Sequence, residues 1–323
     1  MDALLEAHLL REENSTNVRI ENEPPLSVTA LRAAFRVLGS ASPEVAARVA
    51  ERLFLSARRH PRPARELELL ARAARFYVPT DDGQLPAWSW GQGPRVALLV
   101  HGWEGRGAQL GAFVDPLVER GFRVVAFDAP GHGDAEGDRA SLFDHADAVS
   151  RLIGVVGVPD AIIAHSMGGM AVALALSASP APDARLVFVA PPIDPARFAA
   201  HFASQLGIGP EVSLRLRGRV ERRYGRSMDD LAGARLAAQL TSPLLIIHDE
   251  EDRDVPIDSG RALQRAWRGA ELHATRGLGH RRVLRDRSVV ATAVSFVSPR
   301  AHLQPLTKVP PRPRTRFQLA PIS

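Results

Sequence analysis

Hydrophobic positions along the chain follow two different rhythms. Between residues 27 and 78 apolar side chains recur every three or four positions, as Leu31, Phe35 and Leu38 do. This spacing predicts two or three amphipathic helices. From Leu85 onward, short apolar runs of strand length alternate with amphipathic stretches. Strands that alternate with helices in this way predict βαβ units around a mostly parallel sheet.

The runs after residue 80 define the expected core. Strands are expected at 85–91, 96–100, 124–127, 161–164, 186–190, 244–247 and 272–274. Helices are expected at 108–120, 142–156, 167–179, 257–268 and 288–297. Most of these strands are apolar on both faces, which is typical of a sheet that helices cover on both sides. The predicted fold class is therefore α/β.

The remaining segments surround this core. Residues 1–80 are expected to form an N-terminal helical extension, with the first 25 or so poorly ordered. The core spans 81–298 and contains a helical cap at about 193–240, where Phe198, Phe202 and Leu206 recur at helical spacing. The tail at 299–323 is rich in proline and arginine, and we expect it to be disordered because it has little apolar surface to offset its ordering entropy.

Composition excludes several classes of function. The chain has no cysteine, so disulfides, thiolate metal sites and cysteine nucleophiles are ruled out. The net charge of +5 comes from scattered arginines, and aromatic residues make up only 6%, so we expect no nucleic-acid partner. The sequence lacks a secretory signal and a long apolar span, which predicts a cytoplasmic protein without stable membrane insertion. The oligomeric state stays open.

A serine between small residues closes one predicted strand. Ser166 follows the run 161–164, with Ala164 two residues before it and Gly168 two residues after it, and a predicted helix begins at Met167. This is the spacing of the G-x-S-x-G nucleophile elbow, with alanine in place of the first glycine. The pattern predicts Ser166 as the nucleophile and the Met167 N–H as a donor to an oxyanion. A helix-capping serine is the alternative.

Two more turns follow predicted strands. The strand that ends at Val100 continues into His101-Gly102-Trp103, and the next ends in the turn 128–134, Asp-Ala-Pro-Gly-His-Gly-Asp. Together with the elbow, these turns resemble the α/β-hydrolase family over about residues 85–297. The resemblance implies that Trp103 supplies the second oxyanion N–H. The turn 128–134 is similar to the family's D-x-P-G-x-G-x-S turn, with Asp134 and Ala135 departing from the usual serine, and we expect it to be structural.

The resemblance also implies an acid and a base later in the chain, in the order Ser, Asp, His. The strand at 244–247 runs into a turn rich in carboxylates, where the family's D-x-x-V-P pattern selects Asp252, with Asp254 and Asp249 as alternatives. His280 lies in a glycine-flanked loop after the next short strand and is the expected base. The other histidines are expected to be structural or solvated, among them His60, His101, His132, His165, His201, His248 and His302.

These residues predict a serine hydrolase that acts on ester bonds, a carboxylesterase-like enzyme that forms an acyl-enzyme with a small acyl substrate. Neither a metal nor an organic cofactor is expected. Thioesters, lactones, amides and C–C bonds of diketones stay open as substrates, and so does acyl transfer to an acceptor other than water. A non-catalytic binding protein on the same fold is the remaining alternative. The arginines at 215–226 could attract an acidic substrate or form a solvated basic face.

Overall fold

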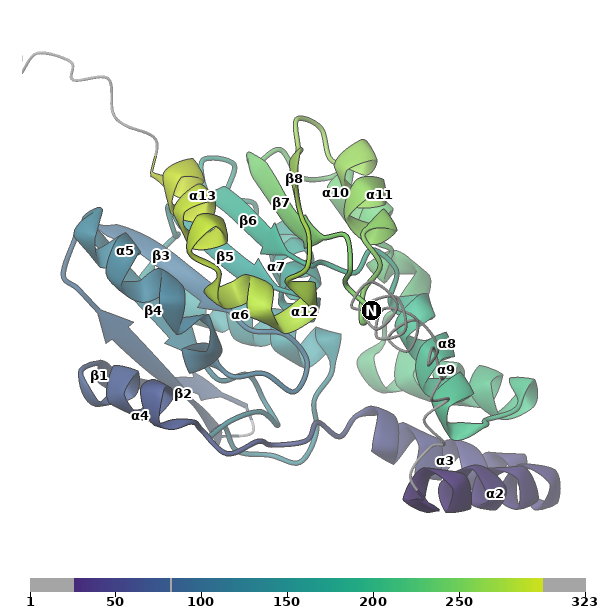
Figure 1. Cartoon of the computed structure of the whole chain (residues 1–323). Helices are drawn as coiled ribbons and strands as arrows, with labels where there is room; N and C mark the ends of the chain where they lie inside the picture. The colour runs from purple at the N-terminus through teal and green to yellow at the C-terminus, as the bar shows by residue number, and fades with distance from the viewer. Residues whose placement is uncertain (1–25, 82, 299–323) are drawn as a thin grey trace, which may run out of the picture. The chain divides into compact units, whose positions relative to one another are not determined.

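The apolar runs of the sequence become neighbouring strands of one sheet. The computed structural model describes residues 26–81 and 83–298, and within these ranges eight strands pair in the order β1-β2-β4-β3-β5-β6-β7-β8 (Figure 1). Strand β2 is antiparallel to both β1 and β4, and all other neighbours are parallel. The strands are β1 (Ala74–Thr80), β2 (Gly83–Trp90), β3 (Arg95–Val100), β4 (Phe122–Phe127), β5 (Ala161–His165), β6 (Arg185–Val189), β7 (Leu244–Asp249) and β8 (Glu271–Thr275).

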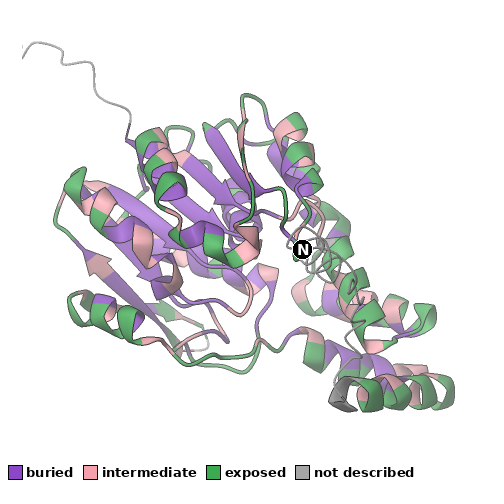
Figure 2. Ribbon diagram, viewed as in Figure 1, coloured by how far each residue is buried: buried purple, intermediate pink, exposed green. Residues whose placement is uncertain are grey.

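Helices cover both faces of the sheet, which explains why the central strands are apolar throughout (Figure 2). One face packs on η1 (Gly107–Phe113, a 3₁₀ helix), α5 (Val114–Glu119) and α13 (Arg287–Val297). The opposite face packs on α6 (Leu142–Val156), α7 (Met167–Ala178) and α11 (Asp258–Ala266). There Gly169 of α7 approaches Phe188, and Gly260 of α11 approaches Ile246. The shorter segments are α4 (Ala64–Ala71), η2 (Met228–Leu231), α10 (Gly233–Ala237), α12 (Gly279–Arg282) and η3 (Val283–Arg285).

Strand β1 corrects the expected extent of the N-terminal helices. The helical interpretation of residues up to 78 is wrong for 74–78, because these residues pair with β2 from Ala74↔Ser89 to Val78↔Leu85. Side chains alternate along β1, with Val78 buried and Tyr77 50% exposed. An edge strand has only one neighbour and needs only a short alternating pattern, which the preceding helical periodicity obscured.

The chain divides into two compact units. The larger unit comprises Ala57–Ile193 and Leu231–Ser323 and contains the sheet, whereas the smaller comprises Met1–Ser56 and Asp194–Asp230. The expected boundaries at 80 and 240 therefore differ from those of the structure, since α4, β1 and α10 belong to the larger unit. The predicted disorder of the first 25 residues and of the tail at 299–323 concerns residues outside the described ranges.

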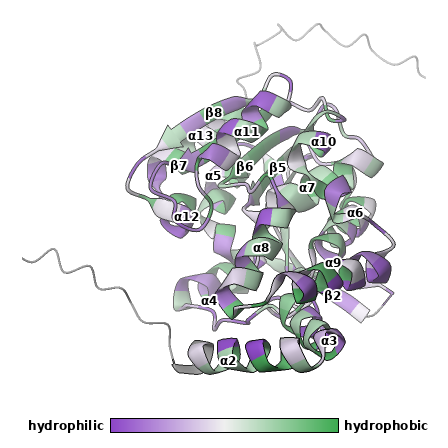
Figure 3. Ribbon diagram, turned by 90° about the vertical axis from the view of Figure 1, so that its right-hand side faces the viewer, coloured by the Kyte–Doolittle hydropathy of each residue, from purple (hydrophilic) through white to green (hydrophobic). Residues whose placement is uncertain are grey.

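The smaller unit joins two distant parts of the sequence. Helices α2 (Leu26–Ala41) and α3 (Pro43–Phe54) pack with α8 (Pro195–Leu206) and α9 (Pro210–Tyr224). Each helix mixes hydrophobic and hydrophilic residues (Figure 3). The apolar contacts include Phe54, whose ring centroid lies 5.1 Å from that of Phe202. The N-terminal helices and the predicted cap thus share one core.

An ionic cluster links α3 to α9 inside the smaller unit. Glu51 is only 5% exposed, and its two carboxylate oxygens accept hydrogen bonds from Arg219 (2.6 Å) and Arg223 (2.8 Å). Arg219 also donates to Glu44 at 2.7 Å. Burial alone would raise the pKa of Glu51, but the two guanidinium groups lower it below its usual value. These arginines of α9 are therefore engaged in pairs within the unit.

We predict that Glu51→Gln loosens the smaller unit. Removing the charge takes away the buried carboxylate that Arg219 and Arg223 share, which should cost about 1–3 kcal/mol of local stability. Hydrogen exchange of amides in α3 and α9, measured by mass spectrometry, should become faster. The matched control is Glu44→Gln, because its side chain is 41% exposed and solvent replaces its hydrogen bonds. Equal exchange in the two variants would contradict the prediction.

Candidate active site

The backbone at Ser166 is strained. Ser166 lies between the end of β5 and the start of α7 with φ 52° and ψ −127°, a backbone conformation that residues other than glycine rarely adopt. Its N–H donates to the carbonyl of Val189 at 2.8 Å, which holds the turn against β6. Strain of this kind persists only where the surroundings enforce it, and it concentrates at functional sites.

Two glycines let the backbone segments approach closely at this turn. A Cβ atom on Gly168 would lie 2.4 Å from the carbonyl oxygen of His101, and one on Gly102 would lie 2.9 Å from Cβ of Ser166. Neither position has room for a side chain. The loop after β3, which includes Trp103, therefore packs directly against the turn that carries Ser166. Met167 is the first residue of α7, so its N–H has no acceptor within the helix.

His280 and Asp252 are joined by a short hydrogen bond. Nδ1 of His280 lies 2.7 Å from Oδ2 of Asp252, whose other oxygen accepts the N–H groups of Asp254 (2.9 Å) and Val255 (2.8 Å). Burial would raise the pKa of Asp252, but these hydrogen bonds, that from His280 above all, lower it below its usual value. Asp252 therefore stays ionised and holds the His280 ring with Nδ1 protonated, which leaves Nε2 able to accept a proton.

The two alternative acids have other contacts. Asp249 accepts hydrogen bonds from the Thr275 hydroxyl (2.8 Å) and the N–H of Leu278 (3.0 Å), so it fixes the loop that leads to His280. Asp254 is exposed and contributes its backbone N–H to Asp252. Of these three carboxylates, only Asp252 has a described hydrogen bond to the His280 ring.

His165 connects the Ser166 turn with the His280 loop. Its Nε2 donates to the backbone carbonyl of His280 at 2.9 Å, and the centroids of the two rings lie 4.7 Å apart. Burial lowers the pKa of His165 to about 3, so the ring stays neutral. No hydrogen bond between the Ser166 hydroxyl and His280 occurs within residues 26–81 and 83–298. Catalytic hydrogen bonds of this kind often form fully only when substrate binds.

His248 supports the turn that carries Asp252, a role that the sequence pattern did not reveal. It is fully buried at the end of β7, and its Nε2 donates to the carbonyl of Val255 at 2.8 Å. Val255 in turn donates its N–H to Asp252. The sequence contains no spacing that distinguishes His248 from a solvated histidine, because its partner lies in a turn whose path only the fold defines.

Three buried histidines lie behind the loop that carries Trp103. The His101 ring centroid is 5.1 Å from that of His132 and 4.8 Å from that of His145, and the His132 ring meets the Trp103 ring edge-on at 5.4 Å. His101 accepts the N–H of Ala129 at 3.0 Å, whereas neither ring nitrogen of His145 has a partner among the described residues. Burial lowers the pKa values of His101 and His145 well below the usual range.

The turn after β4 is structural, as its glycines suggested. Asp128 is completely buried and accepts the N–H groups of Gly107 and Asp134, both at 2.8 Å. A Cβ atom on Gly133 would lie 2.0 Å from the Asp128 carboxylate. Arg62 also donates to Asp128. Burial is the main reason that the pKa of Asp128 is raised.

A cavity of about 750 Å³ opens beside the hydrogen-bonded pair of Asp252 and His280. Its lining includes Asp252 and His280 together with the charged residues Glu250, Glu251, Arg253, Asp254, Arg281 and Arg282. Across the described ranges, no cluster of three or more carboxylate and imidazole groups is arranged to hold a metal ion. Within the same ranges, none of the helices is long and apolar enough to cross a bilayer.

Comparison with known proteins shows the family of this chain. The model of the Alpha/beta hydrolase family matches residues 97–293, which is more than half of the chain. The chain belongs to this family. The predicted α/β-hydrolase fold and the prediction of a hydrolase are thereby confirmed.

The curated relatives of this alpha/beta hydrolase are named for different substrates. The 2-hydroxy-6-oxononadienedioate/2-hydroxy-6-oxononatrienedioate hydrolase 1 of Dechloromonas aromatica is 29% identical over 250 residues, which cover 62% of this chain and 85% of the relative. A monoacylglycerol lipase of Mycolicibacterium smegmatis is 25% identical over 225 residues, which cover 58% of this chain and 80% of the lipase. Among solved structures, an esterase from Exiguobacterium antarcticum superposes with a TM-score of 0.51 at 15% identity, over 69% of this chain and 99% of that one, which bears on the fold alone.

We predict that Asp252→Asn lowers the activity of this hydrolase far more than Asp254→Asn. The first change removes the charge that holds His280, for which a loss of about 10⁴-fold in kcat has precedent in serine proteases. The second leaves the Asp254 backbone N–H in place, so kcat should stay within about threefold, as for a surface change. Steady-state hydrolysis of a p-nitrophenyl ester measures both. A larger loss of activity from Asp254→Asn would assign the role of the acid to Asp254 in place of Asp252.

We predict that His145→Leu makes the larger unit less sensitive to acid. Below about pH 6.5 the unfolded chain binds a proton on His145 that the folded chain excludes, so stability falls as the pH falls. Leucine should therefore be near neutral at pH 7.5 and stabilising by about 1 kcal/mol at pH 5.5. Urea unfolding followed by tryptophan fluorescence reports on this unit, because Trp88, Trp90, Trp103 and Trp267 all belong to it.

His201→Leu is the control for this experiment, because His201 is exposed and belongs to the smaller unit. It should leave the pH dependence of the fluorescence transition unchanged. If His145→Leu shows the same loss of stability between pH 7.5 and 5.5 as the unaltered chain, the proposed cost of protonating this ring is wrong.

Proposed function

We propose that this alpha/beta hydrolase is a serine enzyme that cleaves carboxylic esters, with Ser166 as nucleophile, His280 as base and Asp252 as the acid that orients the base. The observation that carries the proposal is the 2.7 Å hydrogen bond between His280 and a buried Asp252. It is supported by the strained backbone of Ser166 and by His165, which ties the Ser166 turn to the His280 loop. A buried acid, a base and a serine are the set that acyl transfer through a covalent intermediate requires.

The reaction follows from these roles. Nε2 of His280 accepts the Ser166 proton while the hydroxyl oxygen attacks the acyl carbon, and the N–H groups of Trp103 and Met167 are the proposed donors to the oxyanion. Each such donor stabilises the transition state by about 3–4 kcal/mol. The intermediate then expels the alcohol, which takes the proton from His280. Water then attacks the acyl-enzyme while His280 accepts its proton; the bond between the acyl carbon and the Ser166 oxygen breaks, the acid leaves, and His280 returns the proton to Ser166.

The relatives favour two substrate classes for this chemistry. The similarity to a monoacylglycerol lipase supports an ester of a fatty acid as substrate. The similarity to a 2-hydroxy-6-oxononadienedioate hydrolase supports a second candidate, hydrolysis of the C–C bond of a 2-hydroxy-6-oxo acid by the same residues. Thioester hydrolysis and acyl transfer to another acceptor use the same acyl-enzyme and stay open. The cytoplasmic location and the absence of nucleic-acid partners also stay predictions.

We predict that Ser166→Ala abolishes both ester hydrolysis and labelling by a fluorophosphonate probe. The probe forms a covalent bond with an activated serine, so labelling requires the base as well as the nucleophile. Ser150→Ala is a suitable control, since Ser150 lies in the middle of α6 and hydrogen-bonds to the carbonyl of Ala146. Substantial hydrolysis by folded Ser166→Ala would refute the assignment. Absence of labelling of the unaltered, folded chain would favour the non-catalytic alternative.

A substrate panel distinguishes the classes. It should contain p-nitrophenyl esters of increasing acyl length, a monoacylglycerol, an acyl thioester and a 2-hydroxy-6-oxo dienoate. We expect the highest kcat/KM for one of the oxygen esters, because a monoacylglycerol lipase is among the relatives. A preference for the dienoate by more than about tenfold, equal to 1.4 kcal/mol, would favour the second candidate.

A further inference from the structure

A second cavity lies at the opposite end of the sheet from the proposed catalytic residues. It measures about 590 Å³, which is within the usual size range of small-molecule sites. Its lining includes Arg123 near the amino end of β4, Val125 in the middle of that strand, and Val155 and Val156 from the last turn of α6. Ser166, Asp252 and His280 instead follow the carboxyl ends of strands. A six-residue strand is about 20 Å long, so the two places are well separated.

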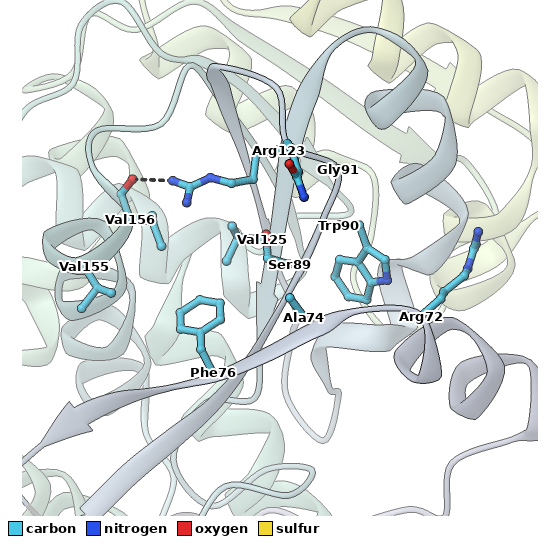
Figure 4. A pocket seen from close by; sticks show the side chains of 11 residues that line it. Arg72, Ala74, Phe76, Ser89, Trp90, Gly91, Arg123, Val125, Val155 and Val156 are labelled. Atoms are coloured by element: carbon cyan, nitrogen blue, oxygen red, sulfur yellow. Dashed lines mark hydrogen bonds between the residues drawn. The ribbon is translucent and has the colours of Figure 1, made fainter.

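Small side chains in the sheet create this space. Ala74, Ser89 and Val125 lie opposite one another in register across β1, β2 and β4, so their side chains share one face of the sheet. Figure 4 shows Phe76 and Val155 on the same side of this row, and both line the cavity. Ala74, Ser89 and Val125 form the floor of the cavity, and Val155, another lining residue, is 54% exposed. An apolar ligand would therefore bury surface that the chain leaves open to water.

Arg123 gives the cavity a positive charge. Its side chain reaches across the opening and donates one N–H to the carbonyl of Val156 at 2.9 Å (Figure 4). A guanidinium has five N–H donors, and no carboxylate in the described ranges forms an ion pair with Arg123. The eleven described residues that line the cavity include two arginines and neither aspartate nor glutamate. The second of these arginines, Arg72, is already paired with Asp115 at 2.7 Å.

We propose that this cavity binds a carboxylate with an aliphatic chain of medium length. The carboxylate would accept hydrogen bonds from Arg123, and the chain would lie between Phe76, Val125 and Val155. Burial of the methylene groups favours binding, and a charged hydrogen bond to the guanidinium fixes the orientation of the ligand. Acids of this class are also what an ester hydrolase releases. That link to the product rests on the proposed function, whereas the binding site itself does not.

Decanoate tests the proposal directly. Isothermal titration with the full chain measures the affinity, and methyl spectra of valine-labelled protein show where the ligand binds. We expect decanoate to shift the methyl signals of Val125, Val155 and Val156, including in Ser166→Ala, where no turnover can occur. Arg123→Gln should weaken this binding about tenfold or more, and Arg123→Lys should retain most of it because the charge remains. Decanol should bind at least about tenfold more weakly than decanoate.

Two further variants separate the cavity from general effects. Arg72→Gln removes an arginine that lines the same cavity but is paired with Asp115, so decanoate affinity should not change. Ser89→Leu fills the floor and should abolish the methyl shifts while tryptophan fluorescence still reports a folded larger unit. The proposal is overturned if decanoate shifts other methyl groups only, if Arg123→Gln binds as well as the unaltered chain, or if decanol binds as tightly as decanoate. Failure of ester hydrolysis in the same preparation would affect only the proposed function.

Discussion

The parallel hydrogen bonding of β5, β6, β7 and β8 is the constraint on which the site depends. Parallel strands end at the same edge of a sheet, so the turn after β5, the turn after β7 and the loop after β8 meet there although long stretches of sequence separate them. Ser166 follows β5, Asp252 follows β7 and His280 follows β8. The register of the strands therefore decides which loops become neighbours, and local hydrogen bonds then decide which atoms meet.

Backbone proximity fixes the positions more tightly than side-chain packing does. Gly168 and Gly102 have no room for a Cβ atom, so the start of α7 and the loop after β3 lie in direct backbone contact. His165 then joins this assembly to the His280 loop through one partly buried hydrogen bond. Asp249 holds the loop before His280 through the N–H of Leu278, and His248 holds the turn after β7 through the carbonyl of Val255. The catalytic proposal thus rests on a frame in which each loop is fixed by at least one partly buried hydrogen bond.

The sequence predicted the elements that depend on continuous apolar runs, and it missed those that depend on distant partners. Strands β3 to β7 and helix α6 lie within about two residues of their expected positions, since buried parallel strands have an unmistakable composition. Strand β1 was missed because its alternation is short and follows a helical pattern. Three neighbouring carboxylates could be ranked only by family resemblance, because their distances to His280 depend on the path of a turn. The partners of Arg219 and Arg223 were equally hidden, since Glu51 precedes Arg219 by 168 positions.

That separation has a consequence for how the protein is made. Helices α2 and α3 leave the ribosome before the sheet, but the residues that complete their core and neutralise Glu51 are synthesised only after most of the sheet. At about 5–20 residues per second, the interval between Glu51 and Arg219 amounts to roughly 10–30 s. During this time α2 and α3 can contact each other, but their native partners α8 and α9 are still missing. The smaller unit can therefore reach its native structure only late in translation, when the larger unit has already received most of its strands.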